Sequence, residues 1–80
     1  EERESVERDS RKKMIAGIRI NVNRATAGEL SLLPGISDET AENIVRYRER
    51  EGRFTTFENL LNVKGVKRKR LKKILPFIEL

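Results

Sequence analysis

The sequence of 80 residues contains no cysteine and no histidine. Without cysteine the chain has no disulfide and no thiolate metal ligand, and without histidine imidazole catalysis and most zinc sites are excluded. No apolar run approaches the roughly 18 residues of a membrane-spanning helix, and no signal-peptide pattern is present. No nucleophile is paired with a general base. We therefore expect no enzyme, no cofactor and no membrane contact by this segment.

The length of the chain allows one small domain. Hydrophobic residues make up 36% and charged residues 39% of it, which is typical of a small helical domain with a thin core. Residues 1–13 are mostly charged and offer only Val6 to a core. We expect a disordered or fraying arm over residues 1–13 and a folded domain over residues 14–80. Because the chain begins with Glu1, we also expect it to belong to a longer parent protein.

A repeat of thirty residues organises the domain. Shifting the chain by thirty positions superposes threonines, a turn glycine and core-like apolar residues: Thr26 on Thr56, Leu30 on Leu60, Gly35 on Gly65 and Ile44 on Ile74. A match at a fixed period indicates one supersecondary unit used twice. Each unit consists of a short helix, a tight glycine turn and a second helix.

The first unit carries clear helix boundaries. Thr26 and Glu29 form a capping box at the start of its first helix. Pro34 marks the end of that helix, and Ser37 is placed to cap the next one. The second unit repeats this plan over residues 56–76. The sequence therefore predicts an all-α fold of four short helices in two pseudo-repeats, with hairpins at residues 33–37 and 63–67 and an extended lead-in before them.

The net charge of +5 is unevenly distributed. Acids and bases balance over residues 1–55, so the whole excess lies in the second repeat. Its seven bases are Lys64, Lys67, Arg68, Lys69, Arg70, Lys72 and Lys73. Seven bases within ten residues, beginning at a glycine turn, are atypical of a merely solvated surface and point to an anionic partner.

A glycine turn that leads into a helix presents unpaired backbone amides together with the positive end of the helix dipole. This arrangement favours phosphate. Two such turns related by a repeat can hold two phosphates of one duplex. Because their donors are main-chain amides, they would recognise the nucleic-acid backbone and not its sequence.

An ordered series of segments resembles the tandem helix-hairpin-helix domain of the competence DNA receptor ComEA family. The segments are Ile20–Thr26, Leu33–Ile36, Ile44–Glu49, Gly52–Phe54 and Lys64–Val66, and the resemblance extends over residues 20–80. It implies a helical module that binds double-stranded DNA without sequence preference. A ComEA-like parent would be extracytoplasmic and membrane-anchored, whereas a parent like the transcription accessory factor Tex would be cytoplasmic. DNA versus RNA and the oligomeric state stay open.

Two departures from the family pattern support an alternative. The family hairpin has a second glycine where this chain has Ser37 in one copy and Lys67 in the other. The first hairpin is also followed by Asp38 and Glu39, which would repel a phosphate. The alternative is a protein-interaction module that kept the fold but lost DNA binding. Metal binding by Asp38 and Glu39 is disfavoured because adjacent residues on a helix point apart.

We expect the second hairpin to dominate DNA binding. The predicted DNA-binding residues are Lys64, Gly65, Lys67, Arg68, Lys69, Lys72, Gly35 and Ser37. Three of them also have a structural interpretation, since Gly35 and Gly65 are needed for the turns without any ligand and Ser37 fits a helix cap. The aromatic residues occupy core-like positions, so base stacking is not expected from them.

Overall fold

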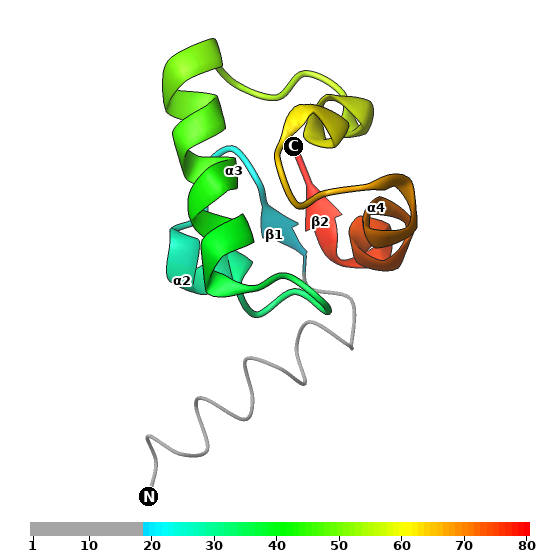
Figure 1. Cartoon of the computed structure of the whole chain (residues 1–80). Coiled ribbons are helices and arrows are strands. Elements are labelled where there is room, and N and C mark those ends of the chain that lie inside the picture. Colours follow the sequence, from blue (N-terminus) through cyan, green and yellow to red (C-terminus); the bar gives the residue numbers. More distant parts are fainter. Residues whose placement is uncertain (1–18) are drawn as a thin grey trace, which may run out of the picture.

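The two repeats of the sequence appear as two helical hairpins in the computed structural model, which describes residues 19–80 (Figure 1). In chain order the elements, with η for a 3-10 helix, are β1 (Ile20–Asn21), α2 (Ala27–Leu30), α3 (Asp38–Glu51), η1 (Phe57–Asn62), α4 (Arg68–Ile74), η2 (Leu75–Phe77) and β2 (Ile78–Glu79). The first repeat supplies α2 and α3, and the second supplies η1 and α4. The arm predicted for residues 1–13 lies outside the described residues.

Both short helices begin with a reciprocal cap. The Thr26 hydroxyl accepts from the Glu29 amide at 3.1 Å, and the Glu29 carboxylate accepts from the Thr26 amide at 2.9 Å. This confirms the predicted capping box. In the second repeat Asn59 takes the place of the glutamate and makes the same exchange with Thr56. The helix that follows is of the 3-10 type, which proteins use in short pieces such as this one of six residues.

The second helices of the two repeats differ in length because of one proline. α3 runs for 14 residues, whereas α4 runs for seven and gives way to the 3-10 turn η2. Pro76 stands in η2 at the position that Arg46 occupies in the middle of α3. Proline has no amide hydrogen to donate and its ring clashes with the preceding turn of an α-helix. Pro76 therefore accounts for the end of α4 at Ile74.

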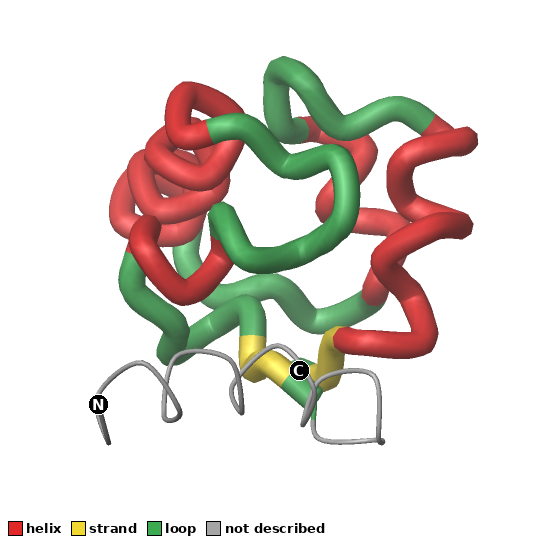
Figure 2. Tube along the Cα trace, turned by 90° about the horizontal axis from the view of Figure 1, so that it is seen from below, coloured by secondary structure: helices red, strands yellow, loops and turns green. Residues whose placement is uncertain are grey.

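A two-stranded parallel sheet completes the otherwise helical fold (Figures 1 and 2). Ile20 is paired with Ile78 and Asn21 with Glu79, and the Val22 amide donates to the Glu79 carbonyl at 3.0 Å. The extended lead-in before the first hairpin was expected from the sequence. Its partner strand was not expected, because two residues are too few to show an alternation of apolar and polar positions.

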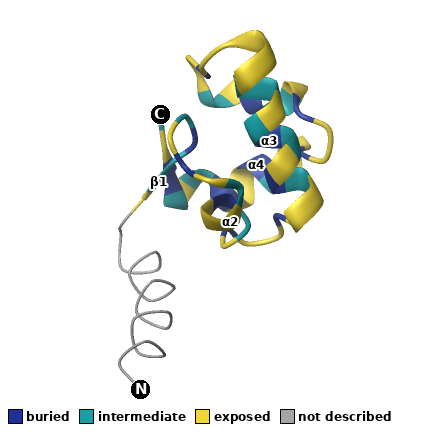
Figure 3. Ribbon diagram, turned by 90° about the vertical axis from the view of Figure 1, so that its left-hand side faces the viewer, coloured by how far each residue is buried: buried dark blue, intermediate teal, exposed yellow. Residues whose placement is uncertain are grey.

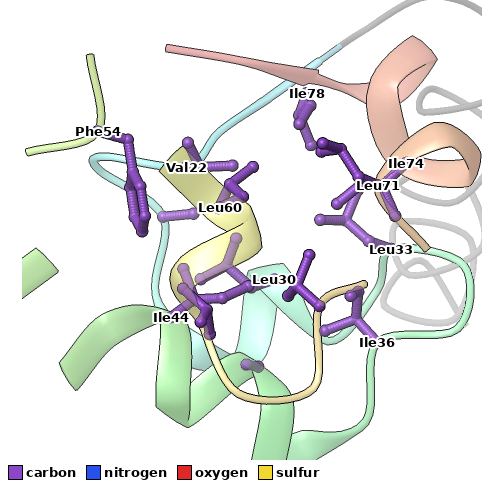
Figure 4. Packing of buried hydrophobic residues seen from close by; sticks show 14 residues of the cluster. Val22, Leu30, Leu33, Ile36, Ile44, Phe54, Leu60, Leu71, Ile74 and Ile78 are labelled. Atoms are coloured by element: carbon purple, nitrogen blue, oxygen red, sulfur yellow. The ribbon is translucent and has the colours of Figure 1, made fainter. Parts of the chain in front are cut away.

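The core lies between the two hairpins and draws equally on both (Figure 4). Its fourteen buried residues are Val22, Ala25, Leu30, Leu33, Ile36, Ala41, Ile44, Phe54, Leu60, Val63, Val66, Leu71, Ile74 and Ile78. Residues 31–41 and 61–71 show the same succession of buried, half-buried and exposed positions. Buried positions occur in α2, α3, η1, α4 and β2, and no charged residue of the described range is buried (Figure 3). The repeat therefore extends from sequence to packing.

The segment that joins the repeats is held by one asparagine side chain. Asn23 donates from Nδ2 to the Phe54 carbonyl at 3.0 Å and accepts at Oδ1 from the Phe54 amide at 2.6 Å. The Phe54 ring is fully buried and stacks on Tyr47 with centroids 5.2 Å apart. The side chain of Asn23 thus satisfies both backbone hydrogen-bonding groups of Phe54, as a neighbouring β-strand would.

We expect Asn23→Ala to lower the free energy of unfolding by about 1–3 kcal/mol, since it leaves two partly buried backbone groups without partners. In a domain of this size that corresponds to a fall in Tm of several degrees. Asn62→Ala is the matched control, because Asn62 is exposed and makes a single 3.2 Å contact with the Tyr47 hydroxyl. Equal Tm values for the two variants in a thermal melt would contradict the assigned role of Asn23.

Candidate nucleic-acid interface

The two hairpin turns share one geometry. In the first, the Ile36 amide donates to the Leu33 carbonyl at 3.1 Å, and in the second the Val66 amide donates to the Val63 carbonyl at 3.0 Å. These four apolar residues are buried and anchor the turns to the core. The third residue of each turn is a glycine, with φ of 78° in the first and 102° in the second. Glycine adopts a positive φ without a steric penalty, whereas most other residues would be strained at this place.

The residues that follow the turns differ in how they cap the next helix. Ser37 is the N-cap of α3, and its hydroxyl accepts from the Thr40 amide at 3.1 Å. This confirms the predicted cap. Lys67 holds the same position before α4 with a similar extended backbone, but its side chain makes no capping hydrogen bond. A lysine ammonium has only donors, so it has nothing to offer the free amides.

The first turns of the two helices carry opposite charges. Asp38 and Glu39 begin α3, whereas Arg68 and Lys69 begin α4. All four side chains are exposed. Over residues 19–80 the ion pairs are Glu42 with Arg46 and Arg50 with Glu51. No base of the second repeat is in an ion pair within that range.

Four of the predicted binding residues line one surface concavity. Its lining consists of Gly65, Lys67, Arg68, Lys69, Arg70 and Lys73. Lys64 and Lys72 are exposed but do not line it, and Gly35 and Ser37 belong to the other hairpin. The set predicted from sequence omitted Arg70 and Lys73. Helical spacing could have indicated Lys73, which lies one turn after Lys69.

The two hairpins also touch each other in a crossed manner. A β-carbon on Gly65 would lie 2.6 Å from Oγ1 of Thr40, which is the third residue of α3. A β-carbon on Gly35 would collide with the guanidinium of Arg70, the third residue of α4. In addition, Asn43 donates to the Lys64 carbonyl at 3.1 Å. Each turn glycine therefore supports a side chain from the opposite repeat.

Between residues 19 and 80, no group of three or more histidine, cysteine, aspartate or glutamate side chains is arranged to hold a metal ion. None of the helices in this stretch combines the length and the apolar character needed to cross a bilayer. Within residues 19–80 the paired hairpins and their basic concavity are therefore the candidate site.

A family model described as a helix-hairpin-helix motif matches residues 16–79. The chain belongs to the helix-hairpin-helix family. The match spans both repeats, so the two hairpins of this helix-hairpin-helix domain fall within it. The sequence-based resemblance to the ComEA domain is confirmed by the relatives that follow.

Three relatives contain a segment similar to this domain. ComE operon protein 1 of Bacillus subtilis is 41% identical over 58 residues, which are 72% of this chain and 28% of that protein. An uncharacterised protein of Haemophilus influenzae is 45% identical over 56 residues, 69% of this chain and 50% of its own length. Endonuclease/exonuclease/phosphatase family domain-containing protein 1 of Xenopus laevis is 41% identical over 61 residues, 76% of this chain and 11% of its own length.

The helix-hairpin-helix domain thus spans half or less of each of these relatives. In the Xenopus protein the matched part is about a tenth of the whole. The enzymatic terms in that protein's name therefore assign no reaction to this segment.

Proposed function

We propose that this helix-hairpin-helix domain binds double-stranded DNA without sequence preference, through backbone phosphates, and that the second hairpin dominates. The observation that carries the proposal is the start of α4. Lys67 occupies the N-cap, and Arg68 and Lys69 occupy the first turn. All three are exposed and line the concavity beside Gly65.

These three bases destabilise α4, the helix that they begin. The N-terminus of a helix carries a partial positive charge, so bases there are unfavourable and acids favourable. An N-cap without an accepting side chain costs about 1 kcal/mol relative to serine or aspartate. The first repeat follows both rules, with Ser37 as the cap and Asp38 and Glu39 behind it. A bound anion explains why the second repeat breaks them, because a phosphate would satisfy the free amides and the bases together.

The absence of sequence preference follows from the type of donor. Backbone amides and exposed lysine or arginine side chains match phosphate oxygens, which are the same in every sequence. The four aromatic residues that could stack on bases pack in or against the core. Phe54 is buried and stacks on Tyr47, and Tyr47, Phe57 and Phe77 are partly buried against the core. The resemblance to the ComEA domain supports the same function.

A second function is favoured by one observation, the acidic start of α3. Asp38 and Glu39 occupy the place where the other hairpin has bases. A domain with one repelling hairpin could serve as a protein-interaction module instead. Titration of the labelled chain with a random duplex, followed by NMR, separates the two. DNA binding predicts fast, saturable shifts at the hairpin amides, whereas the alternative predicts none.

We expect the affinity for DNA to fall steeply with salt. Neutralising roughly three to five phosphates gives a slope of log affinity against log salt of roughly −3 to −4.5. The Kd should be micromolar or weaker, as is usual for nonspecific binding, and similar for unrelated duplexes. Fluorescence anisotropy at several salt concentrations measures both quantities. A flat salt response, or one strongly preferred sequence, would rule out recognition through the backbone.

A further inference from the structure

Arg70 belongs to the second repeat but lies at the turn of the first. It is half-buried, whereas the neighbouring Arg68 and Lys69 are exposed. A β-carbon on Gly35 would collide with Nη1 of Arg70 and would lie 2.9 Å from its Cζ and 3.0 Å from its Cδ. The end of the arginine side chain therefore rests directly on the backbone of the first turn. A side chain at this place would displace the arginine, and the positive φ of 78° separately favours glycine.

The guanidinium in this position has no acceptor of its own among the described residues. Neither of the ion pairs between residues 19 and 80 includes Arg70. In this range every buried side-chain nitrogen or oxygen has a hydrogen-bond partner. Because the Arg70 nitrogens have none within residues 19–80, they are in contact with solvent. Packing on Gly35 restricts the side chain, while its five N–H donors remain available. A held guanidinium of this kind fits a phosphate, whose oxygens can accept two parallel hydrogen bonds.

The two hairpins differ in whether they carry bases of their own. Asp38 and Glu39 leave the first turn without any base of its own. The matching contact in the second turn comes from the uncharged Thr40, where Lys67 and its neighbours already supply positive charge. The two crossed contacts thus come from matching positions of the repeat, but only Arg70 is charged. The first turn, which has no base of its own, is the turn that Arg70 contacts.

We propose that Arg70 is the phosphate-binding side chain of the first hairpin, supplied by the second repeat. This inference rests on the proposed DNA binding and adds to it a second contact point at Gly35. Arg70 also lines the concavity of the second hairpin together with Lys73. It therefore joins the two turns into one continuous basic surface for neighbouring phosphates of a duplex.

The test compares Arg70→Gln with Arg53→Gln in the full chain. Both changes remove one positive charge, but Arg53 is exposed and directly follows Gly52, the C-cap of α3. That end of α3 is the one away from the first hairpin (Figure 1). We expect Arg70→Gln to weaken duplex binding about fivefold at low salt and to reduce the salt slope by about 0.9. Arg53→Gln should change neither. Arg70→Lys should restore the slope but only part of the affinity, because lysine lacks the paired donors.

NMR locates the effect. In the parent chain DNA should shift the Gly35 and Ile36 amides and the Arg70 side-chain Nε–H together. In Arg70→Gln the shifts at the first turn should disappear, while those at Gly65 and Lys67 persist. If glutamine prevents folding, the titration of the parent decides alone, because an unshifted Arg70 Nε–H overturns the inference.

Failure of the inference differs from failure of the proposed function. If the parent binds DNA and Arg70→Gln behaves like Arg53→Gln, the crossed contact has no part in binding although the domain binds DNA. The same holds if Arg70→Gln lowers Tm and leaves the affinity unchanged, which would make the contact purely structural. If the parent shows no binding to a random duplex, the proposed function fails and this inference falls with it.

Discussion

The triple variant Lys67→Gln, Arg68→Gln, Lys69→Gln is expected to lose measurable binding to duplex DNA. Each of these exposed charges contributes on the order of 1 kcal/mol near a phosphate at low salt. Together they account for a loss of about a hundredfold, which moves a micromolar Kd beyond the range of a direct titration. The three residues line one concavity, so their loss removes the charge around Gly65 as a unit. Anisotropy at low salt measures the effect.

A control with equal charge separates position from net charge. Arg46→Gln, Arg50→Gln and Arg53→Gln together also remove three positive charges, from the middle and end of α3 and the connector behind it. This control should keep most of the affinity. The triple variant at α4 should remain folded, because its substituted residues are exposed and Lys67 makes no capping hydrogen bond. A folded triple variant that binds like the parent would exclude the second hairpin as the site and favour protein interaction.

The opposite change at the first hairpin should tighten binding. Asp38→Lys with Glu39→Lys removes two repelling charges and adds two attracting ones beside a turn whose backbone is already shaped like that of the second. At on the order of 1 kcal/mol for each position, the affinity should rise by about tenfold or more at low salt. The salt slope should steepen at the same time, since more counterions are released.

This variant carries a cost in stability that must be measured beside its affinity. Bases in the first turn of α3 oppose the helix dipole and destabilise by about 0.3–1 kcal/mol each. The Ser37 cap remains and should keep the helix start in place. Glu49→Lys with Glu51→Lys is the control, since it makes the same change of charge at the other end of α3. Equal gains in the two variants would show that total charge matters and the first hairpin does not.

Much of the fold could be predicted from the sequence because its boundaries are local. The Thr26 capping box, the Ser37 cap and the stop at Pro76 each involve residues within four positions of one another. The repeat then indicated which apolar positions face the core, and residues of both copies are buried at matching places. Periodicity and caps are strong signals when both copies of a unit carry them.

The features that escaped prediction depend on contacts between distant parts of the chain. β2 is two residues long, too short for any alternation of apolar and polar positions to show. Its pairing with β1 joins residues 58 positions apart. The sequence shows Arg70 only as one of the seven bases of the second repeat, and it does not show that the Arg70 guanidinium reaches Gly35. The repeat held a clue, because Thr40 and Arg70 occupy matching positions and make matching crossed contacts.

The parallel arrangement of β1 and β2 determines how the domain would bear mechanical tension. A pull at residue 19 and residue 80 draws the start of one strand against the end of the other, so the strands are loaded in shear. In shear the hydrogen bonds between the strands share the force and do not open one after another. The shortest line of force between the two ends runs through this pair and bypasses both hairpins. The two hairpin turns would therefore keep their shape under tension until the strand pair yields.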